Sequence, residues 1–179
     1  DLTFEVTSDA RAALTGVDYI ITTIRAGGDA GRLFDEQTCL AHGVLGQETT
    51  GAGGFAMAIR SVPTLVYYCT LAREVANPGH LIFNFTNPSG IITQALRSKG
   101  FDNVYGICDA PSGFIKQLEE ILEIPYGTLD IECYGLNHLS WFRNAKVNGR
   151  DVQRELLDNP RTYEHSEMRL FTREMARIS

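Results

Sequence analysis

Polar residues follow three apolar runs that have the composition of buried β-strands: DYIITTI (18–24), LIFNF (81–85) and NVYGI (103–107). The residues at the ends of these runs are Thr23, Arg25 and Gly27, then Asn87, and then Cys108 and Asp109. Because ligands of open parallel sheets bind beyond the carboxyl ends of the strands, we expect these residues to share one ligand-binding edge. Each segment alone is also compatible with an ordinary turn, so it is their joint placement that favours a site.

Cys108 and His138 are the candidate metal ligands. A thiolate and an imidazole together suit a first-row divalent ion, with carboxylate or substrate oxygens completing the coordination shell. Asn137 precedes the histidine between apolar flanks, where it could orient the ring or bind a substrate hydroxyl. The alternative interpretation is a buried thiol without a metal, because cysteine is among the residue types most often buried.

A glycine-rich segment, GVLGQETTGAGG (43–54), carries one carboxylate, Glu48, and few apolar side chains. Segments of this kind often bind ligands, since glycine lets the backbone approach a partner closely. A flexible linker is the alternative, but linkers seldom carry the sequence Gln-Glu-Thr-Thr among their glycines.

The order of the expected elements predicts an α/β fold with a doubly wound parallel sheet. We expect helices at 9–14, from Pro63 to 75, at 87–100 and at 112–122, and a short strand at 3–6. From Tyr134 the pattern becomes hairpin-like, with Asn148-Gly149 as a type I′ turn. We therefore expect a dinucleotide-binding part over 1–111 and the start of a mixed α+β substrate domain over 112–179.

Composition excludes some classes of partner. The chain has 179 residues, 44% of them hydrophobic, and a net charge of −6 without a basic tract, so nucleic acid is a poor candidate partner. No stretch reads as a membrane span or a signal peptide, and the four cysteines include no C-x-x-C pair. We expect a cytoplasmic protein with reduced thiols and no membrane partner.

Five segments carry a resemblance to glycoside hydrolase family 4, which includes NAD- and manganese-dependent 6-phospho-α- and 6-phospho-β-glucosidases. They are TTIRAGG (22–28), HGVLGQETTGAGGFAMAIRSVP (42–63), FNFTNPSG (83–90), GICDAPSG (106–113) and YGLNHLSWF (134–142). Their order and spacing are family-like over about residues 1–155. The resemblance implies a Rossmann-like fold, similar to lactate and malate dehydrogenases, followed by a substrate domain.

The same resemblance implies roles for individual residues. Cys108 and His138 match metal ligands (Mn²⁺ or another divalent ion), Arg32 and Asn87 match substrate contacts, and Asn137 lies beside the metal histidine. Glu48 matches a carboxylate that raises the basicity of a catalytic tyrosine, and Asp109 matches the general acid of the α-specific members. Thr23, Arg25, Gly27 and Asn87 would line NAD.

The implied reaction is hydrolysis of a phosphorylated disaccharide or glucoside through oxidation, elimination, addition and reduction, unlike two-carboxylate glycosidases. The GQETTGAGG segment resembles the β-specific members and CDAP (108–111) the α-specific ones, with a slight lean to β. The family's glycine-rich phosphate turn and its tyrosine base have no match here, and Tyr163 lacks the family context. We expect a portion of a longer enzyme that forms a homo-oligomer, a dimer or tetramer. The alternatives are a lactate- or malate-type 2-hydroxyacid dehydrogenase and a truncated, non-catalytic nucleotide-binding module.

Overall fold

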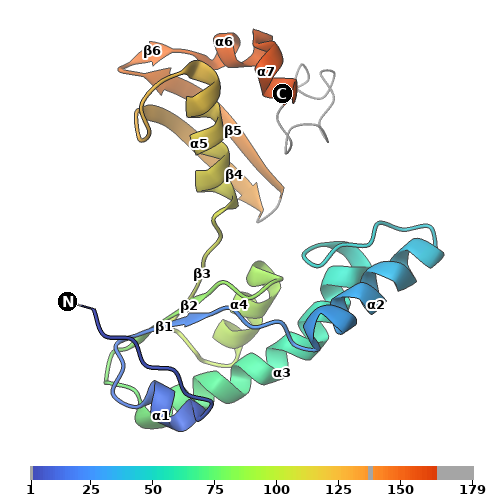
Figure 1. The fold of residues 1–179 in the computed structure, drawn as a ribbon, viewed down its shortest axis with the longest axis vertical. Coiled ribbons are helices and arrows are strands. Elements are labelled where there is room, and N and C mark those ends of the chain that lie inside the picture. The colour runs from blue at the N-terminus through green and yellow to red at the C-terminus, as the bar shows by residue number, and fades with distance from the viewer. Residues whose placement is uncertain (1, 137–138, 165–179) are drawn as a thin grey trace. The chain divides into compact units, whose positions relative to one another are not determined.

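The structure, a computed structural model, describes residues 2–136 and 139–164 (Figure 1). The chain forms two compact units, which meet in the sequence between Cys108 and Asp109. The expected division at 111/112 concerns which part binds the cofactor and which binds the substrate, and it stays a prediction.

Unit 1 is built around a three-stranded parallel sheet in the order β1-β2-β3. Its elements are α1 (Ala10–Leu14), β1 (Tyr19–Thr22), α2 (Gly28–Ala41), α3 (Gly51–Val75), β2 (Leu81–Asn84), α4 (Ser89–Ser98) and β3 (Val104–Gly106). Thr22 at the end of β1 is in register with Asn84 at the end of β2, which is in register with Gly106 at the end of β3. The three strands therefore end at one edge, as the sequence predicts.

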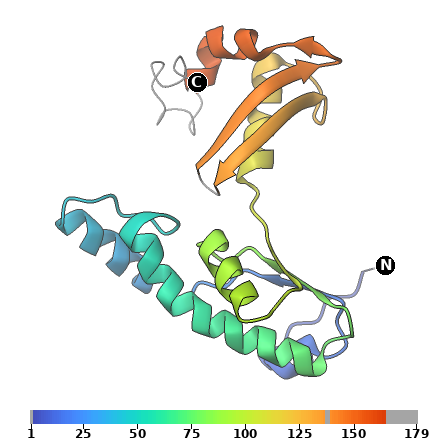
Figure 2. The same cartoon turned by 180° about the vertical axis from the view of Figure 1, so that it is seen from behind.

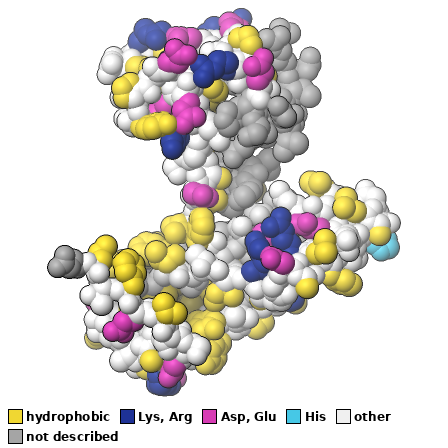
Figure 3. Space-filling view, viewed as in Figure 1, with side chains coloured by type: hydrophobic (Ala, Val, Ile, Leu, Met, Phe, Trp, Pro, Cys, Tyr) yellow, Lys and Arg dark blue, Asp and Glu magenta, His cyan; other side chains and the backbone are white. Residues whose placement is uncertain are grey.

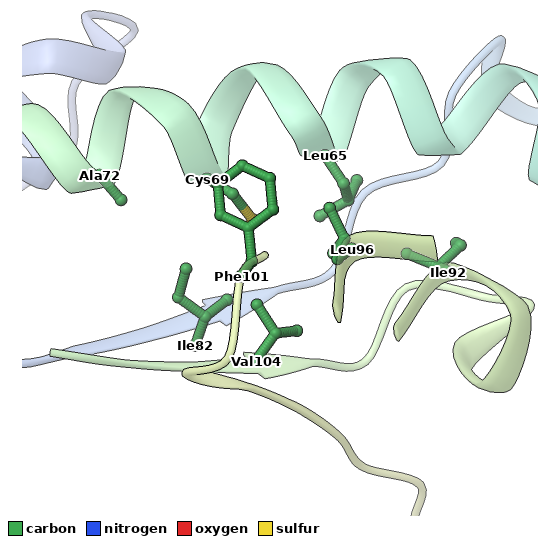
Figure 4. Close-up of a cluster of buried hydrophobic side chains, with 8 residues drawn as sticks. All are labelled: Leu65, Cys69, Ala72, Ile82, Ile92, Leu96, Phe101 and Val104. Atoms are coloured by element: carbon green, nitrogen blue, oxygen red, sulfur yellow. The ribbon is translucent and has the colours of Figure 1, made fainter. Parts of the chain in front are cut away.

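The core of unit 1 lies between the sheet and two helices, α3 and α4 (Figure 4). Leu65 of α3 and Leu96 of α4 have no exposed surface, and Ile82 and Val104 face them from β2 and β3. Figure 2 shows α4 in front of the strands, and Figure 4 shows α3 and α4 on the same side of them. Burial of this one apolar face holds the strand ends in place.

The opposite face of the sheet is exposed in the described residues. Tyr19, Ile21 and Tyr105 are 71%, 65% and 48% exposed, and the rings of Tyr19 and Tyr105 lie beside that of Phe83. The strands are therefore apolar on both faces, although only one face is covered in the described residues. This pattern is typical of sheets that are covered on both sides.

Two helices differ from the sequence expectation. Helix α2 occupies a segment in which we expected no helix, and α3 begins at Gly51 rather than at Pro63, which lies inside it. Proline lacks the N–H that an interior helical position donates, so it is a poor guide to a helix start when neighbouring packing holds the helix. The expected strand at 3–6 is wrong, because these residues form no strand.

Helix α3 is also long and apolar enough, by length and composition, to cross a membrane, which the sequence analysis did not anticipate. This is weak evidence, since a core helix passes the same test. Its buried residues, among them Leu65, Cys69 and Ala72, pack in the core of unit 1.

Unit 2 packs a helix on an antiparallel hairpin (Figure 1). Its elements are α5 (Ala110–Leu122), β4 (Leu129–Leu136), β5 (Leu139–Val147), β6 (Arg150–Asp151), α6 (Gln153–Asp158) and α7 (Pro160–Glu164). Phe114 of α5 lies 4.5 Å, ring centre to ring centre, from Phe142 of β5. Asn148 and Gly149 both have positive φ, as a type I′ turn requires, so this expected hairpin is confirmed.

The buried thiol in the core of unit 1 predicts a loss of stability in alkali. Burial raises the pKa of Cys69 to about 11, while an unfolded cysteine titrates near 8.5. The unfolded chain therefore loses this proton first, and stability that is complete below about pH 8.5 declines as the pH rises toward 11, by about 2–3 kcal/mol. We expect urea denaturation between pH 8 and 11 to show a shallower decline for Cys69→Ala. Cys133→Ala, at an exposed cysteine, is the control, and equal declines for Cys69→Ala and the parent protein would contradict the prediction.

Candidate active site

Two loops meet at the carboxyl edge of the sheet: the β1–α2 loop (residues 23–27) and the β2–α4 loop (residues 85–88). The Ile24 amide donates a hydrogen bond to Thr86 Oγ1 at 2.9 Å, which joins the two loops directly. Thr23 and Arg25 are exposed on the first loop, and Asn87 is half-buried on the second. The structure therefore brings these three predicted residues to one edge.

Asn84, the last residue of β2, fixes the geometry of this edge. Its side chain has no exposed surface; Oδ1 accepts from Thr22 Oγ1 (2.9 Å) and from the Thr86 amide (3.2 Å). Its Nδ2 donates to Thr93 Oγ1 on α4 (3.1 Å) and to the carbonyl of Thr86 (3.3 Å). A buried amide satisfied in this way specifies one arrangement, because each alternative leaves polar groups unpaired.

Ser89 extends the same network to β3. Its hydroxyl lies 3.2 Å from the carbonyl oxygen of Asn84 and 3.5 Å from that of Ile107, just before Cys108. A Cβ at Gly106 would come within 2.8 Å of Thr93 Oγ1, so the end of β3 lies tightly against α4. The exits of all three strands are thus held by one set of buried polar contacts.

A second feature is a group of five charged side chains, here called the charge cluster: Arg25, Asp29, Arg32, Glu36 and Glu48. Glu48 lies between two arginines, with Oε1 accepting from Arg25 Nε at 3.0 Å and Oε2 lying 3.7 Å from Arg32 Nη1. The Glu48 side chain is only 13% exposed. Figure 3 shows basic and acidic side chains side by side on unit 1.

The outer carboxylates complete the charge cluster. Arg25 also pairs with Asp29 at 2.5 Å, and Arg32 Nε donates to Glu36 at 2.8 Å. The hydrogen bond with Glu48 is the main cause that raises the pKa of Arg25, and that with Glu36 is the main cause for Arg32. Both guanidinium groups therefore stay charged and can attract an anionic ligand.

Glycines hold the segment that carries Glu48 close to its neighbours. A Cβ at Gly46 would lie 2.4 Å from the carbonyl oxygen of Glu36, and a Cβ at Gly53 would lie 2.4 Å from that of Gln47. Gln47 in turn accepts from the Thr50 amide at 3.0 Å. The segment is therefore a packed turn leading into α3, and its glycines serve close backbone approach rather than flexibility.

The remaining predicted residues are distributed between the two units. Cys108 is half-buried after β3 in unit 1, and Asp109 is exposed at the start of α5 in unit 2. Asn137 and His138 lie outside the described residues. Over 2–136 and 139–164, no three His, Cys, Asp or Glu side chains form a metal-binding group. The metal pair thus stays a prediction.

Sequence reasoning missed the residues that position the site. Asn84 makes the buried hydrogen bonds at the strand ends, and Thr86 joins the two loops. Arg60 pairs with buried Asp35 beneath the β1–α2 loop. A signal was present for Asn84, because a single amide interrupts an otherwise apolar strand. Nothing in the sequence connects Arg60 with Asp35, 25 residues away.

Residues 1–124 match the sequence profile of the family 4 glycosyl hydrolases. The chain belongs to this family. Its parallel sheet with packed helices is Rossmann-like, as the sequence predicts and as the solved structures of family 4 show.

Individual family 4 proteins are similar over most of the chain. The 6-phospho-beta-glucosidase BglT of Thermotoga maritima is 38% identical over 148 residues, which are 82% of this chain and 35% of that protein. The T. maritima 6-phospho-beta-glucosidase solved with manganese, NAD⁺ and glucose 6-phosphate superposes with a TM-score of 0.79 at 36% identity, over 86% of this chain and 37% of that one. A 6-phospho-alpha-glucosidase from gut microorganisms, solved with NAD and Mn²⁺, gives 0.84 at 29% identity, over 96% and 42%.

The chain spans about a third of the length of the curated family 4 relatives that it matches. The residues that match the family profile, 1–124, include both strand-end loops and the whole charge cluster. Family and fold are therefore established, while the activity of the whole protein is a proposal.

The buried amide at the end of β2 predicts a large effect on stability. Asn84→Leu leaves the Thr22 and Thr93 hydroxyls and the Thr86 amide without their partner, and we expect a loss of about 3 kcal/mol in the free energy of unfolding. Asn103→Leu removes a single, half-buried hydrogen bond to the His80 carbonyl and should cost about 1 kcal/mol. Urea denaturation measures both, and an Asn84 variant no less stable than the Asn103 variant would be evidence against the network.

Proposed function

We propose that the protein is an NAD- and divalent-metal-dependent glycosidase that hydrolyses 6-phospho-glucosides, with a lean to β-linked substrates. Membership of family 4 supports this, as do the names of the relatives. The observation that carries the proposal is the charge cluster: Glu48 bridges Arg25 and Arg32 beside the carboxyl end of β1. That end of a parallel sheet is where ligands bind in this class of fold.

The residues at the sheet edge fit a dinucleotide. Thr23 and Gly27 are exposed on the β1–α2 loop, and Gly27 has a φ of +85°, a conformation that suits glycine and leaves the backbone open to a ligand. Helix α2 starts directly after it, so its N-terminal amides lie beside this loop. We assign Thr23, Arg25, Gly27 and Asn87 to the cofactor, and Asn87 also to the substrate.

The donor set also fits a divalent metal. Cys108 and His138 offer a thiolate and an imidazole, a combination that suits Mn²⁺ less than zinc but accepts it when substrate oxygens complete the shell. We assign these two residues as the ligands, with Asn137 as a substrate contact beside the histidine. Their mutual geometry lies outside the described residues.

The proposed reaction begins with oxidation of the sugar at C3. When bound, NAD⁺ supplies a hydride acceptor for C3 of the glucoside, and the metal supplies a Lewis acid for the C3 oxygen. A C3 ketone acidifies the proton at C2, so a base can remove it and the C1–O bond can break with departure of the aglycone. Water would then add at C1 and a proton at C2, and reduction of the C3 ketone would leave no net redox change.

The chain's own residues divide these tasks. The Glu48 carboxylate raises the basicity of the base that takes the C2 proton. That base is not assigned to a residue of this chain. Asp109 donates a proton to the departing oxygen as the general acid. Arg32, 42% exposed, binds the 6-phosphate with its guanidinium group.

Two further assignments follow from the substrate class. A sugar phosphate is an intracellular metabolite because its charge prevents passage through a membrane, and so we place the protein in the cytoplasm. The β preference rests on the glycine-rich segment, which resembles the β-specific members. The CDAP sequence at 108–111 resembles the α-specific members instead. Assembly into a dimer or tetramer stays a prediction.

The proposed reaction predicts cofactor dependence and isotope incorporation. The full-length protein should cleave a 6-phospho-β-glucoside only with NAD⁺ and Mn²⁺ present. In D₂O the glucose 6-phosphate formed should carry deuterium at C2, because the abstracted proton exchanges with solvent on the base. Mass spectrometry and NMR of the product provide the measurement. Hydrolysis without C2 deuterium would contradict elimination, and net NADH formation from a 2-hydroxyacid would indicate a dehydrogenase instead.

The assignment of Arg32 predicts a loss that depends on the phosphate. Arg32→Ala should lower kcat/KM for a 6-phosphorylated glucoside by about 100-fold, because the dianion loses a charge-assisted hydrogen-bond donor. The dephosphorylated glucoside should change far less. Arg11→Ala is the matched control, since Arg11 is also an exposed arginine paired with a glutamate, Glu74, at 2.6 Å. An equal loss for both substrates would give Arg32 a structural role.

A further inference from the structure

Arg60, in the third turn of α3, lies under the β1–α2 loop. Its Nε donates to the carbonyl oxygen of Ala26 at 3.3 Å, and its Nη1 donates to Asp35 Oδ1 on α2 at 3.0 Å. Its Nη2 pairs with the second carboxylate oxygen of Asp35. One guanidinium group therefore links three segments: α3, α2 and the loop between β1 and α2.

Two glycines leave the space for this guanidinium group. A Cβ at Gly27 would lie 3.1 Å from Arg60 Nε, and a Cβ at Gly31 would lie 3.5 Å from Nη2. The arginine thus packs directly against the backbone where the loop enters α2. Larger side chains at position 27 would displace either the loop or Arg60.

The carboxylate of Asp35 orients the guanidinium group of Arg60. Asp35 is only 7% exposed, and Arg60 is its ion-pair partner among the described residues. A buried carboxylate requires a partner with good geometry, and a bidentate arginine supplies it. Asp35 thus fixes the plane of the guanidinium group, which in turn aims Nε at the Ala26 carbonyl.

We infer that Arg60 is a positioning residue: it holds the backbone of the β1–α2 loop at Ala26 and Gly27 in the conformation that receives the cofactor. The inference rests on the proposed function for the identity of that ligand. Arg60 does not touch the ligand in this role. It acts through the loop, and the same contact sets the start of α2, on which Asp29 and Arg32 of the charge cluster lie.

The alternative role for this ion pair is purely structural, and a double variant separates the two. Arg60→Met together with Asp35→Leu removes both charges, so no buried charge is left unpaired and the fold should survive. The Ala26 carbonyl nevertheless loses its donor. Arg60→Lys keeps a positive charge but cannot serve Asp35 in a bidentate manner and Ala26 at the same time.

Two measurements on the full-length protein test the inference. The first is the Kd for NAD⁺ by titration calorimetry, with the melting temperature recorded for each variant. The second, made without cofactor, is hydrogen exchange at the Gly28 and Gly31 amides, which donate to the carbonyls of Arg25 and Gly27 at 3.0 and 3.1 Å. Arg73→Met is the matched control, because Arg73 also lies on α3 and donates to a loop carbonyl, that of Gly100, near the Phe101 ring.

The positioning role predicts that the double variant melts near the parent temperature, binds NAD⁺ about tenfold more weakly, and exchanges both amides at least about tenfold faster. Arg60→Lys should fall between, and Arg73→Met should keep the parent Kd and exchange rates at these amides. A double variant with the parent Kd and exchange rates overturns the inference. If the double variant does not fold, Arg60→Lys decides by the same criteria. If the parent protein binds no NAD⁺, the proposed function fails, and the exchange rates still decide the role of Arg60.

Discussion

The side-chain amide of Asn84 is the contact on which the candidate site depends most. It is fully buried at the end of the central strand, and its hydrogen bonds reach β1, the β2–α4 loop and α4. An amide in this position acts as both donor and acceptor, so it can join a threonine hydroxyl on one side to a backbone carbonyl on the other. No apolar side chain of similar volume can do both. The apolar core on α3 and α4 supplies the stability of unit 1, and Asn84 determines how its strand ends are shaped.

The charge cluster lies beside these strand ends and is held together by ion pairs rather than by buried hydrogen bonds. Arg25 enters it from the β1–α2 loop, Arg32 from α2 and Glu48 from the turn before α3. The two arginines are 41% and 42% exposed, and ion pairs of half-exposed groups stabilise a protein only weakly, so the proposed function assigns the cluster to ligand binding rather than to folding energy. Its two arginines and three carboxylates carry a net charge of −1. If Arg32 binds the 6-phosphate as proposed, the phosphate must displace a carboxylate from that guanidinium group.

The sequence predicts the sheet well because the strand signals are local. Each strand is a short apolar run, and each is followed by polar residues that the parallel topology must bring to one edge. The limits of helices α2 and α3 were not predictable in the same way. Pro63 is a local signal for a helix start, and the packing that carries α3 through it involves residues far away in the sequence. For the same reason the sequence does not predict the pairing of Arg60 with Asp35. The roles of Glu48 and Arg32 come from the resemblance to a family and stay predictions. The pair of Cys108 and His138 remains a prediction, because the histidine lies outside the described residues.

The close backbone approach at Gly46, Gly53 and Gly54 has a consequence for how this family can vary. At all three positions an added Cβ would lie within 3.0 Å of a backbone atom, and backbone cannot rotate away as a side chain can. Among the glycines of the segment, Gly43 and Gly51 face open space instead, although both have positive φ. Steric exclusion should thus make 46, 53 and 54 nearly invariant across related sequences, while asparagine or aspartate could replace glycine at 43 and 51. This spacing of permissive and forbidden positions would distinguish a packed turn of this kind from a flexible linker of equal glycine content.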